Sequence, residues 1–149
     1  MMANYLELDL DSVARIGLMY LDGDQFEDVQ LDRYGDTDYD FDRFVNVKIA
    51  LTRLENLNPS LALCAALWQF HPKNPRLAIP VVAGKSLPPE GWTRTPAPEQ
   101  MMLARDSGKP QTRDRGEGLV STYYPVKNSD GEIVGVLELL QGMDHIEDL

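Results

Sequence analysis

The spacing of apolar residues predicts two helices early in the chain. Apolar side chains recur at helical intervals in residues 4–20, and they do so again in residues 44–54. The second helix is expected to stop before Asn58 and Pro59, because a residue that precedes proline is restricted to extended conformations. Turn residues and many acids fill the segment between the two helices, which therefore predicts a loop.

Shorter apolar runs further along the chain predict a sheet. The segment SLALCAALWQF, residues 60–70, is short, follows a helix stop and runs into a turn-rich segment, so a buried strand is favoured over a helix. Residues 77–83 predict a neighbouring strand, which Pro80 restricts to an edge or a bulge. Residues 86–98 contain four prolines and predict irregular structure, with Pro98 suited to begin a short helix.

The last strong pattern, residues 121–140, predicts a β-hairpin. Its first arm is rich in strand formers, and its second arm is strongly apolar. Between them the turn ends in Gly131, which can adopt a positive φ. Gly135 interrupts the second arm and predicts a bulge or a close approach by another backbone.

Length and composition favour one domain over residues 1–149, with a helical part at 1–57 and a sheet and pocket part at 58–142. A chain of 149 residues with 43% hydrophobic content can bury a core without a metal, cofactor or disulfide. Cys64 lies within an apolar run, which predicts a buried thiol. No run of about 18 apolar residues occurs, so a membrane span within this sequence is not expected, and neither is a secretion signal.

The net charge of −10 is concentrated near the N-terminus. Residues 1–42 hold twelve acids and two arginines, while the acids and bases of the remaining sequence balance. A phosphate backbone would be repelled by the acidic part, so nucleic-acid binding is not expected.

No motif for catalysis or metal binding stands out. Asp36, Asp38, Asp40 and Asp42 alternate as in a calcium loop, but the Gly and the closing Glu of such a loop are missing, so a solvated acidic loop is favoured. His71 and His145 lie far apart in sequence, without further ligands at metal spacing. Ser121 is not in a Gly-x-Ser-x-Gly elbow, and no phosphate-binding glycine loop occurs. We therefore expect a binding domain and not an enzyme.

The hairpin also carries a resemblance to a known family. Ser-x-Tyr-x-Pro-Val (residues 121–126), the Asp-Gly turn and Gly-Val-Leu (residues 135–137) are similar to the last two strands of Cache sensor domains, which are PAS-like (PDC) domains of bacterial receptors. Three further segments resemble that family in its order, namely MYLDGDQFEDV, LTRLENLNPSLALCAALWQF and LARDSGKPQT.

The resemblance implies an α+β, PAS-like single Cache domain with a long N-terminal helix and a central antiparallel sheet flanked by helices and loops. Such a domain senses a small molecule, an amino acid or a small carboxylate, for a membrane receptor of the histidine kinase, diguanylate cyclase or chemotaxis type. It would lie outside the cytoplasmic membrane, which it would meet only through transmembrane segments not contained in this sequence. The alternative is a cytosolic PAS or GAF-like module that serves protein interaction or dimerisation and binds no small ligand.

The predicted ligand site combines the hairpin with an irregular loop. In carboxylate-binding members of the family, the positions four and two residues before the conserved proline face the ligand, which corresponds to Ser121 and Tyr123. Trp92 and Arg94 offer an aromatic wall and a cation that can grip a carboxylate. Trp68 either lines the same pocket or packs in the core. These five residues form the predicted site.

Several alternatives remain open at this site. Tyr123 is equally compatible with the pocket and with packing, and Thr122 and Tyr124 take its place if the faces of the strand are reversed. Arg113 and Arg115 either close the rim or lie on a solvated loop. The family's basic residues are absent from the hairpin positions, which favours a smaller or less charged ligand. The apolar spread of residues 4–20 further predicts a weak homodimer.

Overall fold

The structure, a computed structural model, describes residues 9–28, 41–84 and 95–142, with the side chains of 41–44 and of Ser60 left aside. Three helices precede the sheet: α1 (Leu10–Tyr20), α2 (Gly23–Asp28) and α3 (Phe41–Glu55), followed by a short 3-10 turn (Pro59–Leu61). The sheet consists of β1 (Cys64–His71), β2 (Asn74–Ala83), β3 (Thr95–Pro96), β4 (Gln111–Gly116), β5 (Leu119–Lys127) and β6 (Ile133–Gly142), with α4 (Glu99–Ser107) between β3 and β4.

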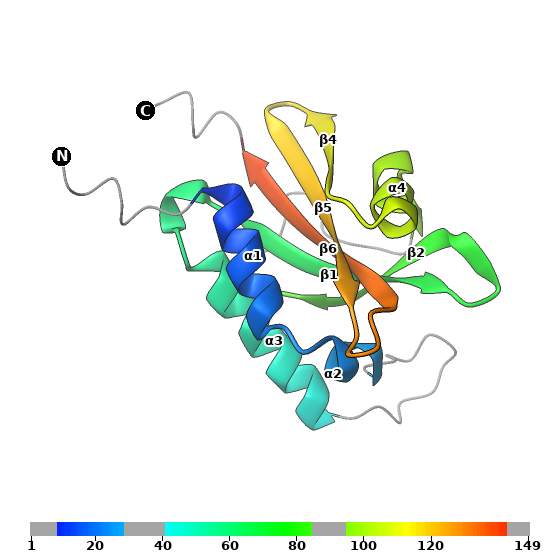
Figure 1. Ribbon diagram of the computed structural model, residues 1–149. Helices are drawn as coiled ribbons and strands as arrows, with labels where there is room; N and C mark the ends of the chain where they lie inside the picture. The colour runs from blue at the N-terminus through cyan, green and yellow to red at the C-terminus, as the bar shows by residue number, and fades with distance from the viewer. Residues whose placement is uncertain (1–8, 29–40, 85–94, 143–149) are drawn as a thin grey trace.

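The strands form one antiparallel sheet in the order β3-β2-β1-β6-β5-β4. Two hairpins, β1–β2 and β5–β6, meet where β1 pairs with β6, so strands far apart in sequence form the centre of the sheet. Figure 1 shows α1 and α3 against one face of this sheet and α4 on the other side. The predicted α+β class and central antiparallel sheet are confirmed.

Each face of the sheet has its own core. The larger core joins α1, α2 and α3 to the sheet through fully buried residues such as Val13, Phe26, Leu51 and Leu137. The smaller core lies beneath α4 and contains, among others, Ala66, Trp68, Met101, Ala104, Tyr123 and Val136. Two separate cores explain why the strands carry apolar side chains on both faces.

The N-terminal helix is shorter than predicted. Asp9 has an extended backbone, and its carboxylate accepts a hydrogen bond from the amide of Ser12 at 2.7 Å, so it caps a helix that begins at Leu10. The prediction of a helix that is continuous from residue 4 to residue 20 is therefore wrong. Residues 4–8 themselves lie outside the described part of the chain. The segment predicted as an acidic loop contains α2, and its remainder, with the aspartates of 36–40, lies outside the described residues.

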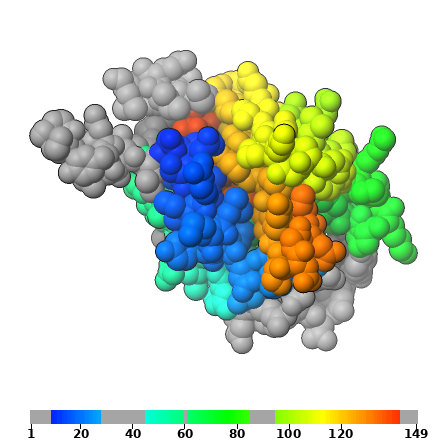
Figure 2. All heavy atoms as spheres, in the orientation of Figure 1, coloured from blue at the N-terminus to red at the C-terminus, as the bar shows by residue number. Residues whose placement is uncertain are grey.

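The structure confirms the predicted helix at residues 44–54 as part of α3, the predicted buried strand as β1, and the predicted hairpin as β5 and β6. Figure 2 shows α2, in blue, directly beside the β5–β6 turn, in orange, where the amide of Ser129 donates to Asp24 at 3.0 Å. That bond is the main reason why the pKa of Asp24 lies below its usual range. Gly131 has a φ of 81° in this turn.

The prolines and glycines of the strands behave largely as predicted. The register between β1 and β2 shifts next to Pro80, which is the expected bulge. At Gly135 an added Cβ would lie 2.5 Å from the carbonyl oxygen of Trp68, so the expected close approach is present. Pro98 precedes α4 as expected, whereas Thr95 and Pro96 form a two-residue strand in the segment predicted to be irregular.

Two further predictions need correction. Arg113 and Arg115 do not lie on a loop, because residues 111–116 form the edge strand β4. Cys64 is half-buried and not fully buried, because it is the first residue of β1 and lies at the end of the sheet. Burial and the nearby carboxylate of Glu55 still raise the pKa of its thiol. Within the described residues, no helix has the length and apolar character that crossing a membrane requires.

Candidate ligand-binding site

Alternation along β5 places Ser121 and Tyr123 on the face of the sheet that α4 covers. Tyr123 belongs to the core beneath α4, whereas Tyr124 belongs to the core of the N-terminal helices. The hydroxyl of Tyr124 donates to Asp11 of α1 at 3.0 Å, which fixes the opposite face of the strand. The predicted separation of Ser121 and Tyr123 from Thr122 and Tyr124 on the two faces of the strand is therefore confirmed.

A buried carboxylate lies at the centre of this face. Glu138 on β6 is 1% exposed and is directly opposite Tyr123 on β5 and Ala66 on β1. Its Oε2 accepts a hydrogen bond from the hydroxyl of Ser121 at 2.5 Å, and its Oε1 accepts one from the indole Nε1 of Trp68 at 2.9 Å. Two residues of the predicted site thus bind the same carboxylate.

Arginines of the edge strand complete the group. Arg115 Nη1 lies 3.2 Å from Glu138 Oε2 and forms an ion pair with it, and the arginine side chain is 23% exposed. Arg113 Nη1 lies 3.5 Å from the hydroxyl of Tyr123. Alternation along β4 points both arginines to the same side, while Thr112 and Asp114 are exposed. We call Trp68, Arg113, Arg115, Ser121, Tyr123 and Glu138 the Glu138 cluster.

The charges in the Glu138 cluster change the titration of Tyr123. Burial and the negative charge of Glu138 raise the pKa of the phenol, while the hydrogen bond from Arg113 lowers it in part. Tyr123 is therefore a neutral phenol at physiological pH, and its hydroxyl accepts the hydrogen bond from Arg113. Together the cluster combines an anionic acceptor with two cationic donors, which are the kinds of group that orient small polar molecules in binding sites.

The structure brings three of the five predicted site residues together. Trp68, Ser121 and Tyr123 are 3%, 0% and 1% exposed and belong to one face. Trp92 and Arg94 lie outside the described residues, so their part of the prediction is not tested. Glu138 was missed, although a single charge inside the apolar run Val-Leu-Glu-Leu-Leu is a signal that could have identified it. Within the described residues, no three His, Cys, Asp or Glu side chains are grouped as metal ligands would be.

Comparison with known proteins relates this chain to solved structures by its fold. No family model matches the sequence, and no curated protein is similar to it at a significant level. Among solved structures, a GAF domain superposes with a TM-score of 0.51 at 14% identity, covering 98% of this chain and 87% of that one. An extracellular ligand-binding receptor from Desulfohalobium retbaense gives a TM-score of 0.48 at 15% identity, covering 93% of this chain and 26% of the receptor chain.

At these identities the likeness concerns the fold alone. The α+β arrangement of the chain is of the PAS/GAF type, which confirms the predicted fold class. Membership of the Cache family in particular stays a prediction.

Proposed function

We propose that the chain is a small-molecule sensor domain whose ligand binds on the α4 face of the sheet, at the Glu138 cluster. The observation that carries this proposal is the buried Glu138, held by side chains from β1, β4 and β5. Burying an ion pair is seldom a route to stability, since apolar residues of similar volume do as well or better. Buried, interacting ionisable groups are instead characteristic of binding sites.

The ligand class follows from the donors and acceptors of the cluster. Glu138 can accept hydrogen bonds from an ammonium group, and Arg113 and Arg115 can donate to a carboxylate. An amino acid or a small carboxylate fits this set. The predicted contribution of Trp92 and Arg94 belongs to the same proposal.

Signalling would be a population shift that starts at α4. Met101 and Ala104 of α4 are buried against the same face, so a ligand that enters there favours one position of this helix. Tyr124, the neighbour of Tyr123 in β5, contacts Asp11 in α1 and so links the same strand to the N-terminal helix. Placement outside the cytoplasmic membrane, as part of a receptor, is the setting we propose for this sensor.

A thermal-shift screen with amino acids, short carboxylates and amines tests the proposal. A ligand at 100 times its dissociation constant adds about 2.7 kcal/mol to the free energy of unfolding. For an amino acid or a short carboxylate, Glu138→Gln should abolish the shift, because it removes the charge while keeping the size of the side chain. Asp130→Asn, at the exposed turn of the same hairpin, should leave it intact. A protein that no compound stabilises would instead support the interaction module without a small ligand.

A further inference from the structure

A cleft opens in the sheet at the end opposite to the β4–β5 turn. The pairing of β1 with β6 ends at Trp68 and Val136, although β1 continues to His71 and β6 begins already at Ile133. Beyond that point β1 stays paired with β2, and β6 stays paired with β5. The cleft between these strand ends has a volume of about 520 Å³ and is also bordered by α2 and the end of α4. We call it the β1–β6 cleft.

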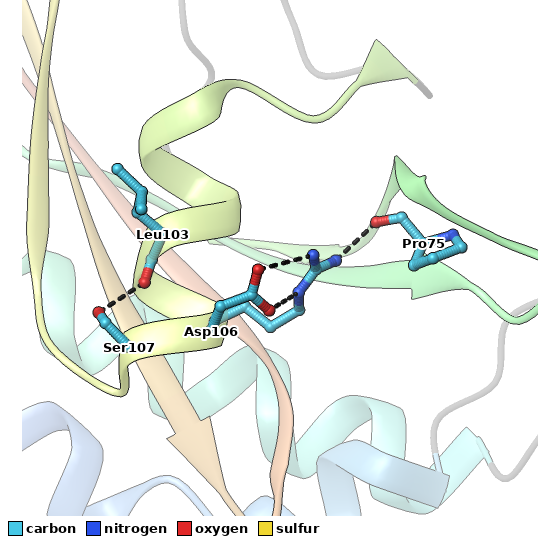
Figure 3. Close-up of polar contacts among 5 residues, drawn as sticks. Pro75, Leu103, Asp106 and Ser107 are labelled. Carbon is cyan, nitrogen blue, oxygen red and sulfur yellow. Dashed lines mark hydrogen bonds and ion pairs between the residues drawn. The ribbon is translucent and has the colours of Figure 1, made fainter.

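One wall of the cleft contains the guanidinium of Arg105, whose positive charge is balanced by the carboxylate of Asp106. The guanidinium of Arg105 lies 4.4 Å from the ring centre of Phe70, and it donates to the carbonyl of Pro75 at 2.6 Å. On its other side it donates twice to Asp106, at 2.8 and 3.3 Å (Figure 3). The hydrogen bonds from Arg105 hold the pKa of Asp106 below its usual range. This arginine therefore contributes shape and rigidity more than free positive charge.

Two carboxylates line the cleft. Glu27 and Glu132 both line it, and the amide nitrogen of Asn128 donates to an oxygen of each, at 3.2 and 3.4 Å. One neutral amide thus holds two like charges close together, and within the described residues neither glutamate forms an ion pair. A cation bound here would relieve their repulsion.

A buried acceptor in the same cleft supports a ligand independently of these charges. Gln69 is 5% exposed, and its amide nitrogen donates to the carbonyl of Phe26 at 3.1 Å. Its side-chain oxygen receives no hydrogen bond from any described residue. Buried acceptors of this kind are usually paired with a donor, so a ligand that carries N–H bonds would satisfy this oxygen.

We propose that the β1–β6 cleft binds a primary alkylammonium ion with a short methylene chain. The ammonium group would bind Glu27 and Glu132 and supply the donor for Gln69, while the methylene chain would pack against Phe70 and Ile133. This site is separate from the Glu138 cluster and does not depend on the proposed function. Because Arg105 and Asp106 belong to α4, occupancy of the cleft would act on the same helix.

Calorimetric titration of the full chain with putrescine tests the cleft. We expect one site whose affinity falls with ionic strength, and a loss of affinity of about tenfold or more for Glu132→Gln and for Glu27→Gln. Glu117→Gln removes an exposed carboxylate at the opposite end of β5, so it should bind putrescine like the wild type. Circular dichroism of each variant verifies that the fold is intact.

Three results would overturn the cleft site. The first is the absence of binding, and the second is an equal affinity in the wild type, Glu132→Gln and Glu117→Gln, which would indicate unspecific attraction to an acidic protein. The third is loss of putrescine binding in Glu138→Gln with retention in Glu132→Gln, which would place the amine at the Glu138 cluster. Titration of Glu138→Gln, which lacks the other proposed site, with succinate, of similar length and opposite charge, should give no heat.

Discussion

Glu138 contacts side chains from three other strands of the sheet. It lies on β6 and binds Trp68 of β1, Ser121 of β5 and Arg115 of β4. Each of these donors lowers the cost of a charge removed from water, so the loss of one affects the carboxylate that remains. The cluster is thus a network whose members should show strong energetic coupling.

Ser121→Ala should lower the free energy of unfolding by about 1 to 3 kcal/mol, because a buried carboxylate loses a donor. Urea unfolding followed by tryptophan fluorescence measures this change. In a Glu138→Leu background the same substitution should cost clearly less, since no carboxylate is left to satisfy. Equal costs in both backgrounds would show that the hydroxyl contributes nothing through Glu138.

The environment of Tyr124 predicts that the free energy of unfolding decreases at alkaline pH. Burial and the hydrogen bond to Asp11 raise the pKa of its phenol, so the folded state retains a proton that the unfolded state loses above about pH 10. The stabilisation that the protonated phenol contributes is complete below that pH, and it is lost as the pH rises towards the raised pKa of the folded state. Tyr124→Phe should therefore be less stable at pH 8, by about 1 kcal/mol for the hydrogen bond, with a gap that narrows above pH 10.

Urea unfolding at pH 8 and pH 10.5 measures this gap, and Tyr20→Phe on the exposed side of α1 is the control. A gap of constant size at both pH values would exclude a contribution from the titration of Tyr124.

At the residue scale, the alternation of side chains along a strand predicted the positions of some site residues but not of others. It placed Ser121 and Tyr123 on one face because neighbouring side chains point to opposite sides. It could not place Glu138, because its partners lie 17, 23 and 70 residues away in sequence. Those contacts depend on the register of three strand pairs, which no local pattern contains.

Among the elements, the predictions succeeded where apolar spacing is strong. The core positions Val47, Leu51 and Leu54 define α3, and the five residues 65–69 of β1 are buried. The polar strand β4 was missed because its residues, QTRDRG, form no apolar face, and its conformation comes from pairing with β5. The start of α1 was misplaced because the Asp9 cap was overlooked within an apolar periodicity.

The close packing at Gly135 gives a prediction for β6. An added methyl group would lie 2.5 Å from both the Trp68 carbonyl oxygen and the Phe26 ring, and a backbone atom cannot move aside easily. Gly135→Ala should destabilise the fold by about 1 to 3 kcal/mol, the usual cost of overpacking.

Gly142→Ala is the matched control, because its added Cβ would meet no atom within 4 Å. It should be neutral or stabilising by up to about 1 kcal/mol, since alanine restricts the unfolded chain. Thermal or urea unfolding measures both, and equal effects at the two positions would contradict the close approach at Gly135.

For the whole molecule, the apolar surface between α1 and α3 favours self-association. Met19 and Tyr20 are 78% and 77% exposed, and Ile49 and Leu57 are 45% and 37% exposed. Tyr20, Ile49 and Leu57 line a groove between the two helices. Exposed apolar surface of this kind is characteristic of contact sites, so the weak homodimer stays our prediction.

Sedimentation velocity at increasing concentration tests the dimer, and Ile49→Glu should shift it towards the monomer. Leu103→Glu is the control, because Leu103 is also exposed, at 44%, but lies on α4 at the other face of the sheet. A wild type that remains monomeric at high concentration would contradict the dimer.

The order of the strands has a consequence for how the chain is synthesised. β1 can pair with β2 at once, but its other edge waits for β6, which is complete only at Gly142. At ordinary rates of translation this interval of about 70 residues lasts roughly 4 to 14 s. During that time the apolar segment CAALWQF has an open edge, which is the kind of strand that pairs with other chains. Nascent or truncated chains that end before residue 133 should therefore aggregate, whereas a chain that includes β6 closes this edge itself.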